Sequence, residues 1–526
     1  MTVLFVAFEF PPLTCGGVHR PLAFLKYLPE FGIEPVVLTT DGESYRRTIV
    51  NPSLDYSLVN RIPANIHLHR APCASPMPAP KTRLGEWCRI FFSLAEEAPK
   101  LWAPQVMACV EKIAREHRAE AIYATSPPFH VANIACQIAR KLSLPLVLDL
   151  RDAWSQWRIG PYGSYLHYLL TLWMERRCLV SASRVVTTSS QTRADLLRLH
   201  PQVPAEKIVV ITNGYDRDIS DWSLSRPMSN DSDARAALFR SAGTFSVNLD
   251  STDGPLSLSL SPSEGERVPS GQVRGFGGSK PERSTREVLS PTGEGQGEED
   301  LALGSNPTSS RPFVIGYVGT FYYSPGARAA MMLPWWRKPP HRMIQYSPRK
   351  EDWLYRSPWF FFQAVARLLA DHPEQQSLLR IRFAGRKPDW IDSQVERFGL
   401  AGNVEFLGPL DHTSALKFQE ECDALLVTSS KVIGGSDYSI AGKTFEYFSM
   451  RKPIIGFVAE GAQKDILTES GLAVICDPDN PADSARQLDE LLSGRIRLQP
   501  NTAFLKTLHR RELTRKLAEV MREAVG

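Results

Sequence analysis

The feature that most constrains the fold is an alternation along the chain. Short apolar runs rich in β-branched residues take turns with longer stretches of helical periodicity. Runs such as LPLVLDL at 144–150 are almost entirely apolar, as strands of a parallel sheet are when both faces are buried. Strands that alternate with helices predict βα units and an α/β fold with doubly wound parallel sheets.

Two blocks of the chain carry this alternation. In the first block we expect strands at 3–8, 35–39, 121–125, 144–150, 184–188 and 207–211. The helical patterns there fall at 18–28, 106–117, 129–142, 164–180 and 191–199. The second block predicts strands at 313–318, 379–384, 404–407, 424–428, 453–457 and 472–476. Its helices are expected at 357–369, 413–421, 443–450, 463–470, 483–492 and 502–524.

A low-complexity segment separates the blocks. Residues 251–310 hold 10 Gly, 12 Ser and 6 Pro with one aromatic residue, Phe276. Such a composition buries too little apolar surface to offset the entropy of ordering, so we predict disorder and no site at 226–311. The expected organisation is two Rossmann-like domains, 1–225 and 312–500, and a C-terminal helix at 501–526 that packs back towards the first. Ligands of such sheets bind at the carboxyl ends of strands, which predicts a site between the two domains.

Charge and cysteine content exclude several classes of function. A formal net charge of +4 is too small to indicate nucleic-acid binding. The eight cysteines show neither CxxC nor Cys/His ligand spacing, so free thiols in a reducing cytoplasm are expected, with no zinc site. The first residues, MTVLFVAFEFPP, have no basic region before the apolar run and predict a strand, not a signal peptide.

Membrane contact is an open hypothesis. No window approaches 18 uninterrupted apolar residues, so no membrane-spanning helix is expected. The apolar run 165–174, followed by Arg176 and Arg177, and the basic stretch 509–522 are compatible with a helix that lies on a membrane surface. We favour an ordinary amphipathic helix packed on a sheet for both.

The first motif with chemical potential is the loop after the first strand, FPPLTCGGVHR at 10–20. Gly16 and Gly17 let a backbone approach a ligand closely, and the helix that follows offers its N-terminus to an anion. Arg20, one turn into that helix, adds positive charge. A tight turn without a ligand explains the same glycines, and we favour it on this motif alone. The loop is not GxGxxG, which argues against a dinucleotide dehydrogenase.

The second motif is LDLRDAW at 148–154, at the end of a predicted buried strand. Its charged residues, Arg151 and Asp152 among them, are costly there unless they face a cleft or pair with each other. The residues alone do not choose between these two interpretations.

The third motif, GGSDYSIAGKTFEYF at 434–448, is the strongest. A polar loop that ends at Gly442 leads into a helix with Lys443 and Glu446 three residues apart, on one face. A helix N-terminus with a lysine suits a diphosphate, and a carboxylate in that position can hold ribose hydroxyls. A capping arrangement with a local ion pair would have the same spacing.

Five segments together resemble glycosyltransferase family 4. They are GKTFEYFSMRKPIIGF, FPPLTCGGVHRPLAFLKYLPEFG, LDLRDAW, ITNGYD and GNVEFLGPLDHTSAL, and they lie in the family's order across both blocks. The resemblance implies a GT-B fold with a nucleotide-sugar donor on the second domain and an acceptor on the first. It also implies retaining sugar transfer without a metal ion or other cofactor.

The resemblance carries over to single residues. Glu446 matches the family glutamate that holds the donor ribose, and Lys443 the lysine near the start of that helix. The family's other glutamate would stand eight positions earlier, where this chain has Tyr438, so Asp437 or a backbone amide is expected to contact the donor sugar instead. Gly16 and Gly17 match the glycines that approach the diphosphate, and Arg151 or Asp152 sits on the acceptor side.

The family's basic pair that binds the diphosphate follows the strand that ends near Gly319. Here that stretch is expanded over 320–362. Arg356 is the best match to the family lysine and Lys350 the second, while Arg328 or Arg337 would supply the partner. The expansion is also rich in tryptophan, for which core packing is favoured over sugar stacking or a landing for a lipid-linked acceptor.

The predicted function is therefore transfer of a sugar from a nucleotide-diphosphate sugar to a glycan or lipid-linked acceptor, in cell-surface polysaccharide or glycolipid biosynthesis. Lys443, Arg356 and two helix N-termini would stabilise the leaving diphosphate. The expected location is the cytoplasm, with peripheral contact at the inner face of the plasma membrane left open. The alternatives are an inactive scaffold relative, which Tyr438 favours, a nucleotide-sugar epimerase and, most remotely, an NAD-dependent enzyme.

Overall fold

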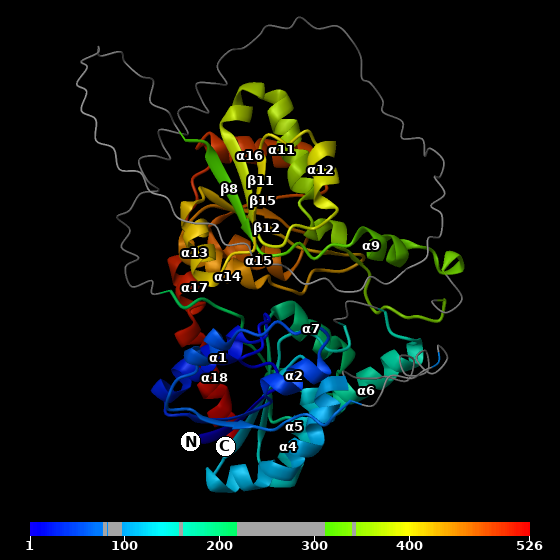
Figure 1. The fold of residues 1–526 in the computed structure, drawn as a ribbon, viewed down its shortest axis with the longest axis vertical. Coiled ribbons are helices and arrows are strands. Elements are labelled where there is room, and N and C mark those ends of the chain that lie inside the picture. The colour runs from blue at the N-terminus through cyan, green and yellow to red at the C-terminus, as the bar shows by residue number, and fades with distance from the viewer. Residues whose placement is uncertain (77–81, 83–96, 157–160, 218–310, 339–342) are drawn as a thin grey trace, which may run out of the picture. The chain divides into compact units, whose positions relative to one another are not determined.

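The fold is taken from a computed structural model, which describes residues 1–76, 82, 97–156, 161–217, 311–338 and 343–526. The prediction of disorder at 226–311 therefore lies outside the described residues, except for Arg311. The described chain holds two parallel sheets, each with helices packed against it (Figure 1). This confirms the predicted pair of doubly wound α/β domains.

The first sheet has seven parallel strands in the order β3-β2-β1-β4-β5-β6-β7. The strands are β1 (Thr2–Ala7), β2 (Glu34–Thr39), β3 (His67–Arg70), β4 (Ala121–Ser126), β5 (Leu146–Leu150), β6 (Arg184–Thr187) and β7 (Ile208–Val210). The helices are α1 (His19–Tyr27), α2 (Gly42–Thr48), α4 (Glu97–Glu116), α5 (His130–Leu142), α6 (Tyr165–Ser181) and α7 (Ser190–Leu199). Short 3-10 helices are η1 (Leu28–Phe31), η2 (Tyr56–Arg61) and η3 (Ala205–Lys207).

The second sheet has six parallel strands in the order β11-β10-β8-β12-β14-β15. The strands are β8 (Phe313–Val318), β10 (Leu379–Ala384), β11 (Val404–Gly408), β12 (Ala424–Thr428), β14 (Ile454–Phe457) and β15 (Ala473–Cys476). A separate antiparallel pair joins β9 (Glu351–Asp352) to β13 (Lys431–Val432).

Helices flank the second sheet, and two more, α17 and α18, follow it at the end of the chain. They are α9 (Pro325–Met332), α11 (Trp359–Asp371), α12 (Ile391–Arg397), α13 (His412–Glu421), α14 (Gly442–Met450), α15 (Ala462–Ser470), α16 (Pro481–Leu492), α17 (Thr502–Thr507) and α18 (Arg510–Val525). The 3-10 helices are η4 (Trp335–Arg337), η5 (Trp353–Arg356) and η6 (Pro373–Ser377). Helices α11 and α16 lie side by side, as α1 and α18 do (Figure 1).

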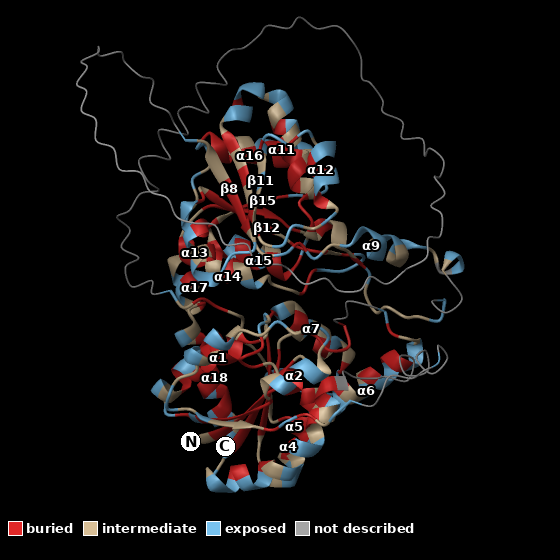
Figure 2. Cartoon of the chain, in the orientation of Figure 1, coloured by how far each residue is buried: buried red, intermediate tan, exposed pale blue. Residues whose placement is uncertain are grey.

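Burial follows the sheets. The central strands are almost wholly buried, as Figure 2 shows, which explains why their sequences are continuous apolar runs. The last helix, α18, contributes Leu513, Leu517 and Met521 to the apolar core of the first sheet, although it follows the second sheet in the chain.

Several elements of the fold differ from the sequence-based expectation, and α2, β9 and β13 are among those not predicted. Strand β3 was not predicted because its sequence, HLHR, is polar; it is an edge strand that pairs with β2 alone and needs no apolar face. The expanded stretch 320–362 forms the unpredicted helix α9, and 391–397 forms α12. The single helix expected at 502–524 is wrong, because the chain breaks into α17 and α18 where Tyr215 pairs with Leu508 and Arg510 through backbone hydrogen bonds.

Within the described residues, no helix combines the length and the apolar character needed to cross a bilayer.

Candidate functional site

Each sheet has one point at which the strand order reverses, and a loop leaves the sheet there. Strand β1 has β2 on one side and β4 on the other, and β8 likewise lies between β10 and β12. Loops that leave such strands at their carboxyl ends diverge and create a crevice, which is where α/β sheets bind ligands. The loop after β1 contains Gly16, and the loop after β8 begins at Gly319.

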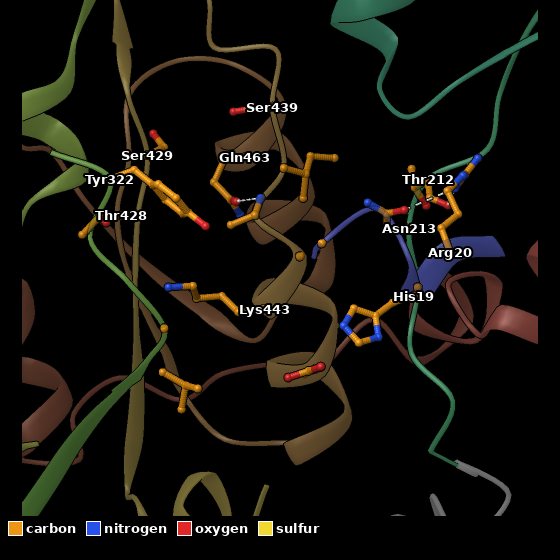
Figure 3. Close-up of a pocket in the computed structure, with 18 of the residues that line it drawn as sticks. His19, Arg20, Thr212, Asn213, Tyr322, Thr428, Ser429, Ser439, Lys443 and Gln463 are labelled. Carbon is orange, nitrogen blue, oxygen red and sulfur yellow. Dashed lines mark hydrogen bonds between the residues drawn. The ribbon is translucent and has the colours of Figure 1, made fainter. Parts of the chain in front are cut away.

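A cavity of about 500 Å³ lies at these loops. Its lining comes from both domains: Gly16, His19 and Arg20 from the first, and Gly319, Arg356, Asp437, Gly442, Lys443 and Glu446 from the second. Figure 3 shows His19, Arg20 and Asn213 on one side of the cavity and Lys443, Ser429 and Gln463 on the other. The volume suits a ligand of several hundred daltons.

Lys443 is the central cation of this cavity. It stands in the first turn of α14, whose leading N–H groups have no acceptor inside the helix. Its Nζ lies 3.4 Å from the centre of the Tyr317 ring, and it makes no hydrogen bond or ion pair with any residue that the structure describes. Burial lowers the pKa of Lys443 to about 7, while Glu446 acts in the opposite direction. An anionic ligand would supply the missing partner.

Glu446 is one turn further along the same helix face. Its half-buried carboxylate lines the cavity and has no hydrogen-bond or ion-pair partner among the described side chains. It does not close an ion pair with Lys443, so the local-pair interpretation of their spacing is not what the structure contains. Both groups are available to a ligand.

Gly319 sits directly beneath the lysine. Its φ of +112° disfavours any other residue, and a Cβ there would lie 3.3 Å from Lys443 Nζ. Its N–H donates to the Ala384 carbonyl, 2.8 Å away, and so holds the loop against the neighbouring strand. The glycine keeps open the space around the ammonium group.

Arg356 is the member of the expanded stretch that reaches the cavity. It donates to Ser430 Oγ at 3.2 Å and to Glu351 Oε2 at 3.3 Å. Arg328 instead pairs with Asp352, while Arg337 and Lys350 are exposed and lie outside the cavity lining. Of the four basic candidates in this stretch, only Arg356 adds positive charge beside Lys443.

Asp437 is a buried carboxyl in the cavity wall. Its Oδ1 accepts hydrogen bonds from the Ser439 N–H and Oγ, at 3.1 and 3.0 Å, but its buried Oδ2 has no partner. Burial raises the pKa of Asp437 to about 6. An unsatisfied buried oxygen at a cavity wall can accept a ligand hydroxyl.

Tyr438 lies behind the wall and not in it. The ring is buried, its hydroxyl donates to Glu351 Oε1 at 2.9 Å, and the Arg349 guanidinium stacks on it with 4.4 Å to the ring centre. The residue thus fixes the loop that carries Asp437, and it is not among the residues that line the cavity.

Gly16, Gly17 and Arg20 of the first domain differ in how far they are available to a ligand. Gly16 lines the cavity, whereas Gly17 packs where a Cβ would collide with Arg151 and Glu9. Arg20 borders the cavity, but its guanidinium is taken up by a two-fold pairing with Asp149, at 2.9 and 3.0 Å, and by carbonyls of residues 211 and 212. Its charge is largely compensated before any ligand binds.

Arg151 and Asp152 do not reach the cavity lining. Arg151 pairs with Glu9 at 2.6 Å and contacts the Pro127 carbonyl, which fixes it at the strand end. Asp152 is next to it; burial raises the pKa of Asp152 to about 6, with Arg151 and then Arg356 among the neighbours that lower it. Asp152 therefore lies within electrostatic reach of Arg356, at the edge of the site.

The structure adds residues that sequence reasoning missed. Ser429 and Ser430 follow β12 directly, and the rule that strand carboxyl ends carry sites would have found them. Gln463 Oε1 accepts the Ala441 N–H at 2.8 Å, while its Nε2 has no partner and borders the cavity. His19 has a pKa lowered to about 4, first by burial and then by Arg510, so it is neutral at physiological pH. No sequence signal marks Gln463, because it comes from a different helix.

The tryptophans of the expanded stretch behave mainly as packing residues. Trp353 Nε1 donates to Glu351 Oε2 at 3.2 Å, and Trp359 packs edge-on against Phe398. Trp336, in contrast, is exposed to solvent.

Comparison with known proteins places the two domains in families. Residues 16–214 match the model of a glycosyl transferase 4-like domain, and residues 355–494 match the model named glycosyl transferases group 1. Together the two matches cover more than half of the chain and include lining residues from both sides of the cavity. The chain belongs to the glycosyltransferases. The family 4 resemblance seen in the sequence is thereby confirmed.

Solved structures show that this glycosyltransferase shares the GT-B fold. The lipopolysaccharide outer core galactosyltransferase WaaB is 10% identical with a TM-score of 0.51, and the match covers 99% of each chain. HepE of Anabaena, solved with UDP, is 14% identical with a TM-score of 0.47, covering 100% of this chain and 96% of HepE. The UDP-GlcNAc 2-epimerase of Neisseria meningitidis is 11% identical with a TM-score of 0.45, covering 99% and 100%. No curated protein matches the chain.

Proposed function

We propose that this glycosyltransferase moves a sugar from a nucleotide-diphosphate sugar to a glycan or lipid-linked acceptor of the cell surface. Transfer would proceed with retention and without a metal ion or other cofactor. The observation that carries the proposal is Lys443, a cavity cation with no ion-pair partner among the described residues, whose pKa burial has lowered to about 7.

The donor would occupy the second domain's side of the cavity. Its diphosphate would lie between Lys443, Arg356 and the N-terminus of α14, where positive potential is already in place. Glu446, which has no partner among the described side chains, would accept the ribose hydroxyls. Asp437 Oδ2 would accept a hydroxyl of the sugar, which is the contact left open by Tyr438.

Catalysis in this proposal is electrostatic. The bond from the anomeric carbon to the diphosphate breaks as negative charge grows on the leaving phosphate, and preorganised cations lower the energy of that charge most in a site that excludes water. Lys443 and Arg356 both line the cavity, the first held by a helix and the second by Ser430 and Glu351. The neutral His19 and the edge residue Asp152 face the acceptor side.

Donor binding tests the first half of the proposal. A panel of nucleotide-diphosphate sugars is screened by thermal shift, because a ligand that binds only the native state raises the melting temperature. The matching donor should stabilise the wild type, and Lys443→Met or Glu446→Gln should lose that shift. Lys464→Met on α15, a partly exposed lysine paired with Glu460, is the matched control and should keep it.

Turnover tests the second half. Release of the nucleotide should require the acceptor, continue in EDTA and give a product with the donor's anomeric configuration by NMR. Full activity in Lys443→Met would refute the role of the lysine. Donor binding without turnover would instead identify an inactive relative, and a changed sugar without acceptor would identify an epimerase.

A further inference from the structure

Helix α6 turns a row of polar residues towards the protein and a row of large apolar residues towards solvent. The face packed against the protein carries His167, Thr171 and Glu175, which repeat every four positions, together with Tyr168, Cys178 and Leu179. The face towards solvent carries a stripe of large apolar residues with helical spacing: Leu166, Leu169, Leu170, Trp173 and Val180. Of these, Leu166 is 62% exposed and Trp173 is 52% exposed. A surface helix of a globular protein normally has the opposite arrangement.

Hydrogen bonds hold the helix in this orientation. The buried Glu175 accepts from the Ser155 N–H at 3.1 Å, from Ser155 Oγ at 2.6 Å, and lies 2.8 Å from His200 Nε2. Tyr168 accepts from Gln156 Nε2 at 3.0 Å. Rotating the helix to bury its leucines would expose apolar packing and break this network, so the outward stripe is a fixed property of the fold.

The apolar surface continues from α6 onto the second domain. Tyr346 packs against Tyr165 and Tyr168, with ring centres 4.9 and 4.8 Å apart, and its backbone pairs with Tyr162 in an antiparallel bridge. Just before it, Met343 and Ile344 are also exposed. We call this combined surface, Tyr165–Trp173 of α6 with residues 343–346, the apolar platform.

The exposed charges on the platform's own segments have one sign. On α6 and residues 343–350 the exposed charged side chains are Arg176, Arg177 and Lys350, and the acidic Glu175 is buried against His200. Arg177 also stacks on Trp173, with 4.6 Å from its guanidinium carbon to the ring centre. A tryptophan beside arginines at the edge of an apolar stripe matches the boundary between lipid headgroups and acyl chains.

We propose that the apolar platform docks this glycosyltransferase on an anionic lipid bilayer. The leucines and Trp173 would enter the headgroup boundary, and Arg176, Arg177 and Lys350 would meet the acidic headgroups. The basic stretch 509–522 has no such role, because α18 buries its apolar face in the first domain and Arg515 pairs with Glu512 and Glu519. The proposal does not rest on the identity of donor or acceptor.

Vesicle flotation without donor or acceptor tests the platform. The full chain should bind vesicles of phosphatidylglycerol and phosphatidylcholine about tenfold more strongly than pure phosphatidylcholine, and added salt should weaken the binding. The double variant Leu166→Gln, Trp173→Gln should bind both vesicle types about tenfold more weakly, since it removes apolar surface without changing charge. Arg176→Gln with Arg177→Gln should lose only the preference for the anionic vesicles.

The control is Val50→Gln, which removes an apolar side chain 90% exposed elsewhere on the first domain and should bind like the wild type. All four substituted side chains of the test variants are exposed, so melting temperatures should stay close to that of the wild type. Wild-type protein that ignores anionic vesicles, or an apolar variant that binds them as well as wild type, would overturn the proposal. A wild-type dimer that the apolar variant turns into monomer would assign the platform to a second copy of the chain instead.

Discussion

Two ionisable side chains in the cavity are held in states that their surroundings disfavour. Burial lowers the pKa of Lys443 to about 7 and raises the pKa of Asp437 to about 6, so near neutral pH Asp437 is charged and Lys443 is partly charged, each at a cost to the folded protein. Among the described residues, Glu446 acts on Lys443 and Arg356 acts on Asp437, but burial outweighs both of these opposite charges. Such strain is expected where a ligand completes the interactions.

The pKa of Lys443 predicts how donor affinity depends on pH. A bound diphosphate stabilises the ammonium form, so its binding raises the lysine pKa. Below pH 7 the lysine is already protonated and the affinity is level; above pH 7 binding must take up a proton, and affinity falls up to about tenfold per pH unit. Calorimetry at pH 6.0–8.5 in buffers of different ionisation enthalpy measures both effects.

Two variants sharpen this measurement. Lys443→Met should bind donor weakly and without proton uptake, whereas Lys464→Met should titrate like the wild type. A wild-type affinity that stays constant across this range, with no proton uptake, would contradict the assignment of the diphosphate to Lys443.

The raised pKa of Asp437 predicts that removing its charge will stabilise the folded protein but weaken donor binding. Its folded pKa is raised, so stability is lost as pH rises from its ordinary value near 3.8 through about 6. Asp437→Asn keeps the oxygen that Ser439 needs but removes the buried charge. The free energy of unfolding at pH 7.5 should therefore increase by about 1–3 kcal/mol, and the gain should vanish at pH 4.

Urea denaturation at both pH values measures this gain, with the exposed Asp371→Asn as control. The same Asp437→Asn protein should bind donor at least about tenfold more weakly, because the amide cannot accept the sugar hydroxyl as a carboxylate does. An unchanged donor affinity would remove Asp437 from the site.

At the scale of elements, the cavity wall depends on the close contact between the loop at Asp437 and the loop at Gly461. The chain at Asp437 pairs with Gly461, where the Asp437 N–H donates to the Glu460 carbonyl and the Ala462 N–H donates to the Asp437 carbonyl. Gly461 has a φ of +137°, and a Cβ there would collide with the Asp437 backbone. The start of α15 is therefore part of the donor loop's support.

Gly461→Ala should displace that loop. We expect it to lower the free energy of unfolding by about 1–3 kcal/mol, from the positive φ and the collision together, and to weaken donor binding. Gly402→Ala is the control, since a Cβ at Gly402 meets nothing within 4 Å. Thermal melts with and without donor measure both effects; a Gly461→Ala protein that matches the control would show that the contact is dispensable.

At the scale of the molecule, the chain just after the first sheet contacts the segment that leads back to that sheet from the second. The Tyr215 N–H donates to the Leu508 carbonyl at 3.3 Å, the Arg510 N–H donates to the Tyr215 carbonyl at 2.9 Å, and Arg510 pairs with Asp216 at 2.6 Å. Beyond this point α18 returns to the core of the first sheet. The end of the chain thus stabilises its beginning.

Leu517→Ala tests this dependence. The side chain is fully buried among first-sheet residues, so its truncation should cost about 2–4 kcal/mol. The loss should appear as faster hydrogen exchange in β4 and β5, which lie almost four hundred residues earlier in the chain, with β10 and β12 less affected. Val525→Ala, exposed on the same helix, should change neither. Equal loss of protection in both sheets would show that they unfold as one unit.

The sequence alone determined the α/β class, most strands and the position of Lys443 and Glu446. These follow from local rules: parallel strands buried on both faces must be apolar, and residues three apart on a helix share a face. It did not reveal β3, since an edge strand escapes the first rule, nor the break at 508–509, which backbone pairing with Tyr215 imposes.

Only the tertiary structure decided which charged groups remain available. Arg20 and Arg151 resemble Lys443 in sequence, but Asp149 and Glu9 already neutralise both arginines, and those partners lie more than a hundred residues away. Likewise the periodicity of α6 showed two faces without showing which one is buried. That choice was made by Ser155 and His200, which give Glu175 its hydrogen bonds and leave the leucines outside. Pairing and desolvation depend on contacts between distant segments, and no local pattern contains them.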